Sequence, residues 1–156
     1  MADVARALGA EVIAYKNTPV DGVRCVDIET ISKEADILTI HLPLTDKTRG
    51  IFGEDEIALM KKNAIIVNMA RGAVIDEKAF AGAIKSGKIG AFGTDVYSVE
   101  PMSEDSPFVE ILNYPNTLFT PHMAWGAFES RARCMEEIAK NITAFYEGKT
   151  RNRVDL

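Results

Sequence analysis

Short apolar runs alternate with amphipathic stretches along this chain. The runs that predict β-strands lie at residues 11–15, 36–41, 64–68, 89–94 and 116–120. Helical spacing of apolar residues is found at residues 2–8, 29–35, 53–60, 76–86 and 128–147. The run at 36–41 is apolar almost throughout, as in a strand that is covered on both faces. This order predicts an α/β fold built on a doubly wound parallel sheet.

Local signals mark several of the element ends. Asp76 stands where a helix N-cap is expected, and Gly87 and Gly148 stand where helices are expected to stop. Pro43 follows the second strand run and should end it, because proline has no amide hydrogen to donate to a sheet. The stretch 98–115 contains three prolines and predicts a loop.

Composition narrows the functional classes. The 156 residues carry a formal net charge of -5, and 47% of them are hydrophobic, which suits a globular domain with a core. Basic residues are scattered, so we expect no nucleic-acid partner. No apolar run reaches the roughly 20 residues of a membrane span, and the N-terminus lacks a secretory signal. Cys25 and Cys134 show no metal spacing, so we expect reduced thiols, a cytoplasmic protein and no metal site.

Three polar side chains follow three of the expected strands, where each strand gives way to a loop. They are Arg71, Glu100 and His122. In open α/β sheets, ligands bind at the carboxyl ends of the strands. We therefore expect these three side chains to converge on one site.

The three residue types suit reversible hydride chemistry on a 2-oxo acid. Histidine suits a proton donor to the ketone oxygen, because its unperturbed pKa is about 6.5. A carboxylate such as Glu100 beside His122 would stabilise the protonated imidazole and fix its tautomer. Arg71, between two small residues, can hold a carboxylate with two parallel hydrogen bonds and polarise the ketone oxygen.

Each of these residues also has an ordinary structural interpretation. His122 alone could be a histidine satisfied by its neighbours, Glu100 a solvated loop carboxylate, and Arg71 part of a structural salt bridge. Asp95 could cap a turn, or it could hold the carboxamide of a nicotinamide. His41 lies within an apolar run, and we interpret it as structural.

Five motifs together resemble the D-isomer-specific 2-hydroxyacid dehydrogenases, and most closely the glycerate dehydrogenase and hydroxypyruvate reductase branch. The motifs lie at residues 35–45, 47–50, 68–76, 94–101 and 120–125. The resemblance implies that Arg71 binds the substrate carboxylate and carbonyl, and that His122 donates and accepts the proton, supported by Glu100. It implies nucleotide contacts from Leu42, Pro43, Met69, Ala70, Arg71, Asp95, His122 and Ala124. Trp125 would stand near the substrate pocket, or else pack in the core.

The resemblance also sets expectations for cofactor and assembly. The cofactor would be NAD. NADP use is possible, because Lys16 stands where family members often carry an acidic residue for the ribose hydroxyls. The partners would be a small 2-oxo or 2-hydroxy acid and further copies of the chain in a homo-oligomer such as a dimer.

Relative to the family pattern, the first strand of the Rossmann-like sheet and its glycine-rich phosphate turn are missing. Residues 1–126 would form a partial NAD(P)-binding domain, and residues 127–156 a helix and tail that pack toward an absent substrate domain. We therefore expect strands 11–15 and 36–41 to re-pair or to pair with another chain, and we expect little or no activity from the isolated chain. The alternative is a non-catalytic nucleotide-binding or dimerisation module of the co-repressor type.

Overall fold

The computed structural model describes residues 1–16 and 18–154. The chain divides into two compact units, residues 1–121 and residues 122–156, and each is described by itself. The sequence interpretation placed the division after residue 126, and residues 155 and 156 of its predicted tail lie outside the described residues.

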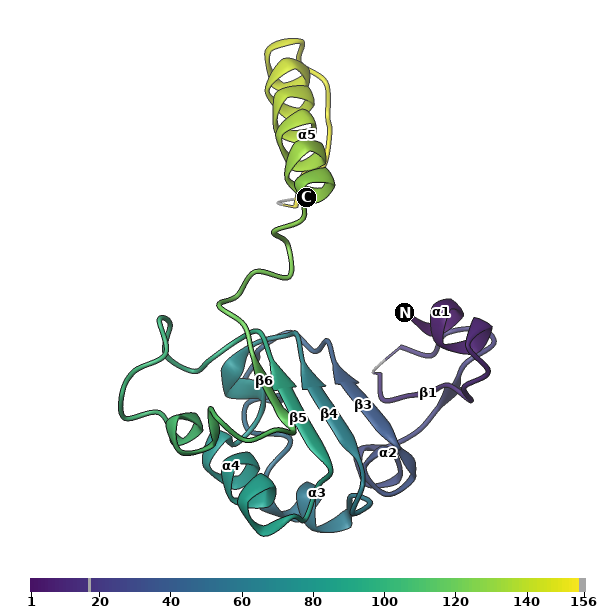
Figure 1. Cartoon of the computed structure of the whole chain (residues 1–156). Helices are drawn as coiled ribbons and strands as arrows, with labels where there is room; N and C mark the ends of the chain where they lie inside the picture. Colours follow the sequence, from purple (N-terminus) through teal and green to yellow (C-terminus); the bar gives the residue numbers. More distant parts are fainter. Residues whose placement is uncertain (17, 155–156) are drawn as a thin grey trace. The chain divides into compact units, whose positions relative to one another are not determined.

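The first unit is built on a parallel sheet (Figure 1). Its strands are β3 (Ile37–Ile40), β4 (Ile65–Asn68), β5 (Ala91–Thr94) and β6 (Thr117–Phe119), in the order β3-β4-β5-β6. Every neighbouring pair is parallel, so all four carboxyl ends meet at one edge. The predicted α/β fold with a Rossmann-like parallel sheet is confirmed.

Helices lie against one face of this sheet. They are α2 (Ile28–Glu34), α3 (Glu54–Leu59), α4 (Glu77–Ser86) and the short 3-10 helices η1 (Gly72–Val74) and η2 (Pro107–Ile111). Alternate strand residues point into a core that they share with the helices, where Phe92 contacts the rings of Phe80 and Phe108. The core therefore lies between this sheet face and the helices.

The helix ends follow the predicted chemistry. The Asp76 side chain accepts a hydrogen bond from the Ala79 backbone N–H at 3.0 Å, and this caps α4. Gly87 ends α4 with φ of 70°, in the left-handed region that glycine enters at little cost.

The opposite face of the sheet is open in the described residues. Ile37, Ile65 and Leu118 point from it with exposed fractions of 64%, 40% and 66%. The expectation that the run at 36–41 is covered on both faces is therefore wrong for Ile37, because the described helices lie on the other face.

The N-terminal part of the first unit forms a separate small sheet. After α1 (Ala2–Ala7), β1 (Ile13–Ala14) pairs in parallel with β2 (Arg24–Cys25), a strand too short for the sequence pattern to reveal. β1 does not pair with β3. The expected re-pairing of strands 11–15 and 36–41 is thus not observed within the described chain, and pairing with another chain stays a prediction.

The second unit contains α5 (Phe128–Tyr146), which carries an exposed apolar stripe. Arg151 in the tail returns to this helix, where its guanidinium donates to Glu137 and Asn141. Cys25 and Cys134 are both free, and Cys134 is exposed on α5. Among the described residues, no helix has both the length and the apolar character that a membrane crossing requires.

Candidate functional site at the carboxyl edge of the sheet

A buried asparagine shapes the turn that follows β4. Asn68 is fully buried, and its side-chain amide donates to the Arg71 carbonyl at 3.1 Å. Its side-chain oxygen accepts from the Ala70 N–H at 3.0 Å. These two bonds fix the backbone that presents Arg71. The sequence interpretation missed this role, although an asparagine at the end of an apolar run is a usable signal for a turn.

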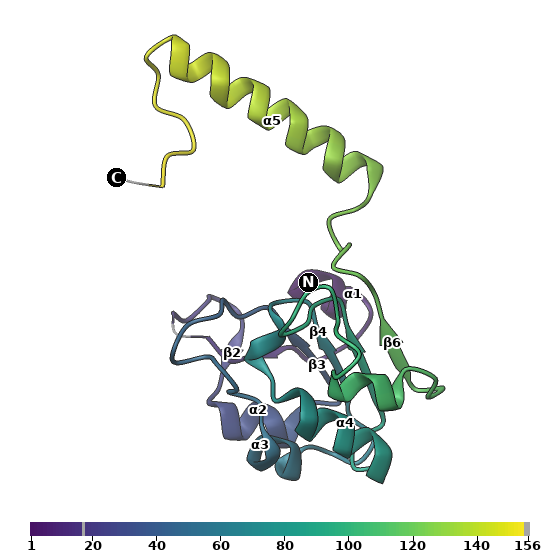
Figure 2. The same cartoon turned by 90° about the vertical axis from the view of Figure 1, so that its left-hand side faces the viewer.

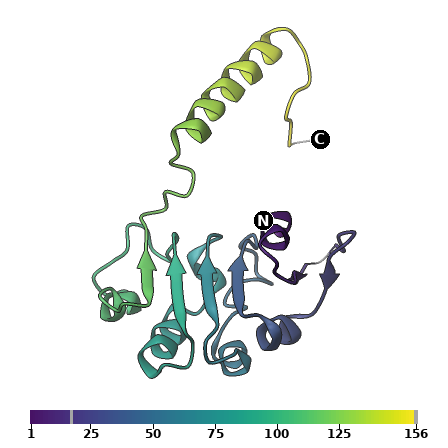
Figure 3. The same ribbon diagram turned by 45° about the vertical axis from the view of Figure 1, so that its right-hand side comes forward.

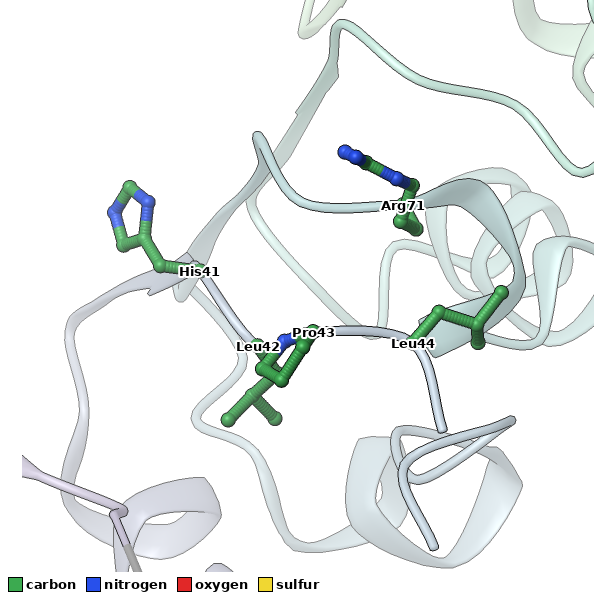
Figure 4. Close-up of a pocket in the computed structure, with 5 residues that line it drawn as sticks. All are labelled: His41, Leu42, Pro43, Leu44 and Arg71. Carbon is green, nitrogen blue, oxygen red and sulfur yellow. The ribbon is translucent and has the colours of Figure 1, made fainter. Parts of the chain in front are cut away.

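Arg71 lines an open pocket of about 410 Å³ at the carboxyl ends of β3 and β4 (Figure 4). Its guanidinium donates to the Ala70 carbonyl at 2.7 Å. The other lining residues are His41, Leu42, Pro43 and Leu44. This volume is in the range of small-molecule sites, and the lining combines apolar surface with one cation.

His41 differs from its predicted placement. β3 ends at Ile40, whose carbonyl accepts the Met69 N–H at 3.3 Å. His41 therefore follows the strand instead of lying within it, and its exposed side chain lines the pocket. The interpretation of His41 as a purely structural residue of an apolar strand needs this correction.

Gly72 brings the loop after β5 against the turn after β4. A Cβ atom at Gly72 would lie 1.9 Å from the Tyr97 carbonyl carbon and 2.2 Å from the Ser98 nitrogen. Only a residue without a side chain permits this approach. The close packing places the loop that leads to Glu100 beside the turn that carries Arg71.

Glu100 organises its own loop. Its carboxylate accepts the Tyr97 N–H at 3.1 Å, while Glu77 at the start of α4 accepts the Ser98 N–H at 2.6 Å. Glu100 is also exposed. It is therefore held near the carboxyl edge but accessible to a ligand.

Asp95 joins the ends of three strands. It is 2% exposed, its backbone N–H donates to the Asn68 carbonyl at 3.1 Å, and its carboxylate accepts from the Thr120 hydroxyl. Tyr97 adds a second link to the end of β6, because its hydroxyl donates to the Thr120 carbonyl at 2.8 Å. These links support the turn interpretation of Asp95, and its contact with a carboxamide stays a prediction.

The phenol of Tyr97 is electrostatically constrained. Burial raises the pKa of Tyr97, and the negative charges of Asp95, Glu100 and Glu77 raise it further. The neutral phenol is therefore favoured in the folded state, where it donates its hydrogen bond.

This shift predicts a loss of stability at alkaline pH. A tyrosine whose folded-state pKa lies above its unfolded value, about 10, contributes stability below pH 10 that is lost as pH rises through the folded pKa. Between about pH 9 and pH 11, the unfolding free energy should fall more for the wild type than for Tyr97→Phe. Urea unfolding at each pH measures this difference. Tyr146→Phe, at an exposed position, is the control. If the unfolding free energy of Tyr97→Phe changed with pH as steeply as that of the wild type, the raised pKa would not belong to Tyr97.

The second unit begins with a tight turn that carries the candidate imidazole. His122 has φ of 52°, in the left-handed region, and its carbonyl accepts the Trp125 indole N–H at 2.9 Å. Trp125 is 63% exposed, so its alternative interpretation as a core residue does not hold in this unit. Ala124 in the same turn is exposed as well.

The predicted site residues therefore lie in two groups. The first unit brings Arg71, Glu100 and Asp95 to the carboxyl edge, with Leu42 and Pro43 at the pocket and Met69 and Ala70 in the turn after β4. The second unit holds His122, Ala124 and Trp125. Convergence of His122 with Arg71 and Glu100 stays a prediction.

Comparison with known proteins matches this arrangement to one family. Residues 1–124 match the NAD binding domain of D-isomer specific 2-hydroxyacid dehydrogenase. A glycerate dehydrogenase from Methylorubrum extorquens is 38% identical over 151 residues, which are 97% of this chain and 47% of that protein. A hydroxypyruvate reductase from Blautia hydrogenotrophica is 37% identical and covers 97% of this chain and 48% of its own length.

Solved structures agree with the sequence matches. The crystal structure of D-lactate dehydrogenase with NAD+ from Lactobacillus jensenii superimposes with a TM-score of 0.91 at 28% identity, covering 99% of this chain and 51% of that one. The chain thus spans about half the length of the relatives that it matches. It belongs to the D-isomer-specific 2-hydroxyacid dehydrogenase family, and its residues 1–124 match the NAD-binding domain of that family.

Proposed function

We propose that this chain supplies the nicotinamide-binding and proton-transferring part of an oxidoreductase for small D-2-hydroxy acids and 2-oxo acids, of the glycerate, hydroxypyruvate or glyoxylate type. The observation that carries the proposal is the pocket at the carboxyl edge, where Arg71 stands beside the apolar surface of Leu42 and Pro43. The names of the relatives support the substrate class.

The residues present suit the nicotinamide end of the cofactor. Leu42, Pro43 and Leu44 offer apolar surface to a flat ring, and Met69 is 39% exposed in the turn after β4. When bound, NAD accepts or supplies the hydride. The exposed Lys16, two residues after β1, would tolerate a 2'-phosphate, so NADP remains compatible with this chain.

Arg71 would bind the substrate carboxylate. Its guanidinium has further donors beyond the one given to the Ala70 carbonyl, and a carboxylate can accept two of them in parallel. A substrate held in this way presents its carbonyl toward the same cation, which polarises the carbonyl oxygen.

His122 would carry the proton to and from the substrate oxygen, and Glu100 would orient the imidazole. Glu100 is exposed on a loop that Tyr97 and Gly72 position, which keeps its carboxylate at the carboxyl edge of the sheet. This division of roles requires His122 to reach the substrate oxygen in the assembled enzyme.

We also propose a cytoplasmic protein that works as a homo-oligomer, such as a dimer. The free thiols support the cytoplasmic assignment. The exposed apolar stripe of α5 and the open sheet face leave apolar surface for contacts with other polypeptides.

A second candidate is a nucleotide-binding or dimerisation module without turnover. Exposed apolar surface on both units favours it for the chain alone. Titration with NADH, followed through the fluorescence of the single tryptophan, Trp125, detects binding in either case. Oxidation of NADH with hydroxypyruvate separates the two functions, because only the oxidoreductase consumes NADH.

Arg71 provides the direct test of the oxidoreductase. The chain is joined to the half of the Methylorubrum extorquens glycerate dehydrogenase that it does not match. In this chimera, Arg71→Lys should lower kcat/KM for hydroxypyruvate roughly 100-fold, because a single ammonium replaces two charge-assisted hydrogen bonds. NADH binding should change far less. Arg133→Lys, on an exposed position of α5, is the matched control. Equal turnover by Arg71→Lys and the control would refute the assigned role.

A further inference from the structure

Thr120, the residue that follows β6, makes three hydrogen bonds to the end of β5 and the loop after it. Figure 3 shows β5 and β6 as neighbouring strands that end at the same edge of the sheet. The Thr120 N–H donates to the Thr94 carbonyl at 3.1 Å, and the Thr120 hydroxyl donates to the Asp95 carboxylate. The Thr120 carbonyl accepts the Tyr97 hydroxyl at 2.8 Å. The loop after β5 therefore fixes the chain at the end of β6 partly through the phenol of Tyr97.

Tyr97 also holds Glu100, through a different group. Its backbone N–H donates to the Glu100 carboxylate at 3.1 Å. One residue thus bonds to Glu100 through its backbone and to Thr120 through its side chain. A tyrosine side chain has only two rotatable bonds between its backbone and its ring, so fixing the hydroxyl also restrains the backbone N–H.

Packing fixes the ring and the backbone of Tyr97 but does not need the hydroxyl. The ring lies edge-on to Phe108 of η2, with 6.4 Å between the ring centroids. Phe108 belongs to the core on the side of the sheet where α2, α3 and α4 lie (Figure 2). Gly72 lies against the Tyr97 carbonyl. A phenylalanine would keep these contacts, so the bond from the hydroxyl to Thr120 is the feature that packing leaves unexplained.

The surroundings of the phenol keep it able to donate this bond. Burial raises the pKa of Tyr97, and the negative charges of Asp95, Glu100 and Glu77 raise it further. The hydroxyl therefore stays protonated across the neutral pH range. Its bond to Thr120 is a permanent connection in that range.

We propose that Tyr97 is a positioning residue for the proposed hydride chemistry. Its hydroxyl couples the loop that presents Glu100 to Thr120, from which the chain continues through Pro121 to His122. The inference rests on the proposed function, in which Glu100 orients the imidazole of His122. Tyr97 acts through these two residues, because it holds the Glu100 carboxylate in place while the proton moves.

Hydrogen exchange in the full chain tests the coupling without any substrate or cofactor. Tyr97→Phe keeps the ring and the backbone N–H but removes the bond to Thr120. The amide at position 97 should then exchange at least roughly threefold faster, because the loop that pairs it with Glu100 opens more often. Tyr114→Phe is the matched control and should exchange like the wild type. Tyr114 is 37% exposed and lies before β6, at the opposite end of that strand.

Turnover in the chimera with the Methylorubrum extorquens glycerate dehydrogenase tests the role in the reaction. Tyr97→Phe should lower kcat for hydroxypyruvate about tenfold, which corresponds to the loss of one hydrogen bond. Its KM should stay near the wild-type value, because Arg71 keeps its own hydrogen bond to the Ala70 carbonyl. Tyr114→Phe should match the wild type in both constants.

Tyr97→Leu separates the hydroxyl from the ring. If the ring alone mattered, Tyr97→Phe would keep the wild-type kcat and only Tyr97→Leu would lose it, and this result would overturn the proposal. Unchanged exchange at position 97 in Tyr97→Phe would also overturn it. Circular dichroism checks the fold of each variant. A wild-type chimera that binds NADH but does not oxidise it with hydroxypyruvate would overturn the proposed function and the positioning role together, whereas wild-type turnover that Tyr97→Phe retains in full overturns the positioning role alone.

Discussion

Replacing His122 with glutamine should lower kcat for hydroxypyruvate reduction by about 10²–10⁴-fold in the chimera described above, because general acid–base catalysis contributes rate factors of that size. Glutamine keeps a polar side chain of similar length but does not release or accept a proton near neutral pH. The proton on the substrate oxygen would then come from water, while the site that binds substrate and nucleotide is retained. Stopped-flow measurement of NADH oxidation at saturating hydroxypyruvate gives kcat directly.

Glu100→Gln in the same chimera separates proton transfer from orientation. The amide still accepts hydrogen bonds but carries no negative charge, so the protonated imidazole loses its stabilising partner. We expect a smaller loss of kcat than for His122→Gln, and a double variant no slower than His122→Gln alone, because the two residues act as one unit. The shared role would be refuted if His122→Gln kept the wild-type kcat. It would also be refuted if the kcat loss of the double variant equalled the product of the two single losses.

Replacing Gly72 with alanine should lower the unfolding free energy of the chain by about 3 kcal/mol, at the upper end of the usual cost of overpacking. The added methyl group would lie 1.9 Å from the Tyr97 carbonyl carbon, so backbone atoms must move to admit it. The loop that carries Glu100 would separate from the turn that carries Arg71. Urea denaturation followed by circular dichroism measures the change.

Gly82→Ala is the matched control for this substitution. Gly82 lies within α4, and a Cβ atom there meets nothing within 4 Å. Alanine is a better helix former than glycine by roughly 0.5–1 kcal/mol, so this variant should be slightly more stable than the wild type. If Gly72→Ala changed stability by as little as its control, close packing would not be what holds the two loops together.

Local sequence signals predicted most of the helices and strands, because the ends of these elements depend on residues that are close in the chain. The cap at Asp76 and the left-handed Gly87 both rest on contacts within one turn of helix. The apolar runs predicted the strands, and the strand side chains that face the helices are buried. β2 escaped prediction because two paired residues, Arg24 and Cys25, produce no periodic pattern.

The sequence predicted part of the candidate site, because the order of the elements decides which residues reach the same edge of the sheet. Arg71, Glu100 and Asp95 lie at the carboxyl edge because parallel strands bring their ends together, and that follows from the order of elements. The exposure of His41 at the pocket was missed because the end of β3 depends on its last hydrogen bond to β4. The buried role of Asn68 was missed for the same reason, since its partners are fixed only in the folded turn.

The order of apolar runs and polar loop residues was enough to establish the α/β class, the parallel sheet and the residue types available for hydride chemistry, because periodicity and chain order are properties of neighbouring residues. Folding in three dimensions established the approach of Gly72 to Tyr97, the pocket beside Arg71 and, within the described residues, the exposed sheet face at Ile37. These features arise where segments far apart in the chain meet or fail to meet. Their energies depend on distances of a few ångströms that no local pattern records.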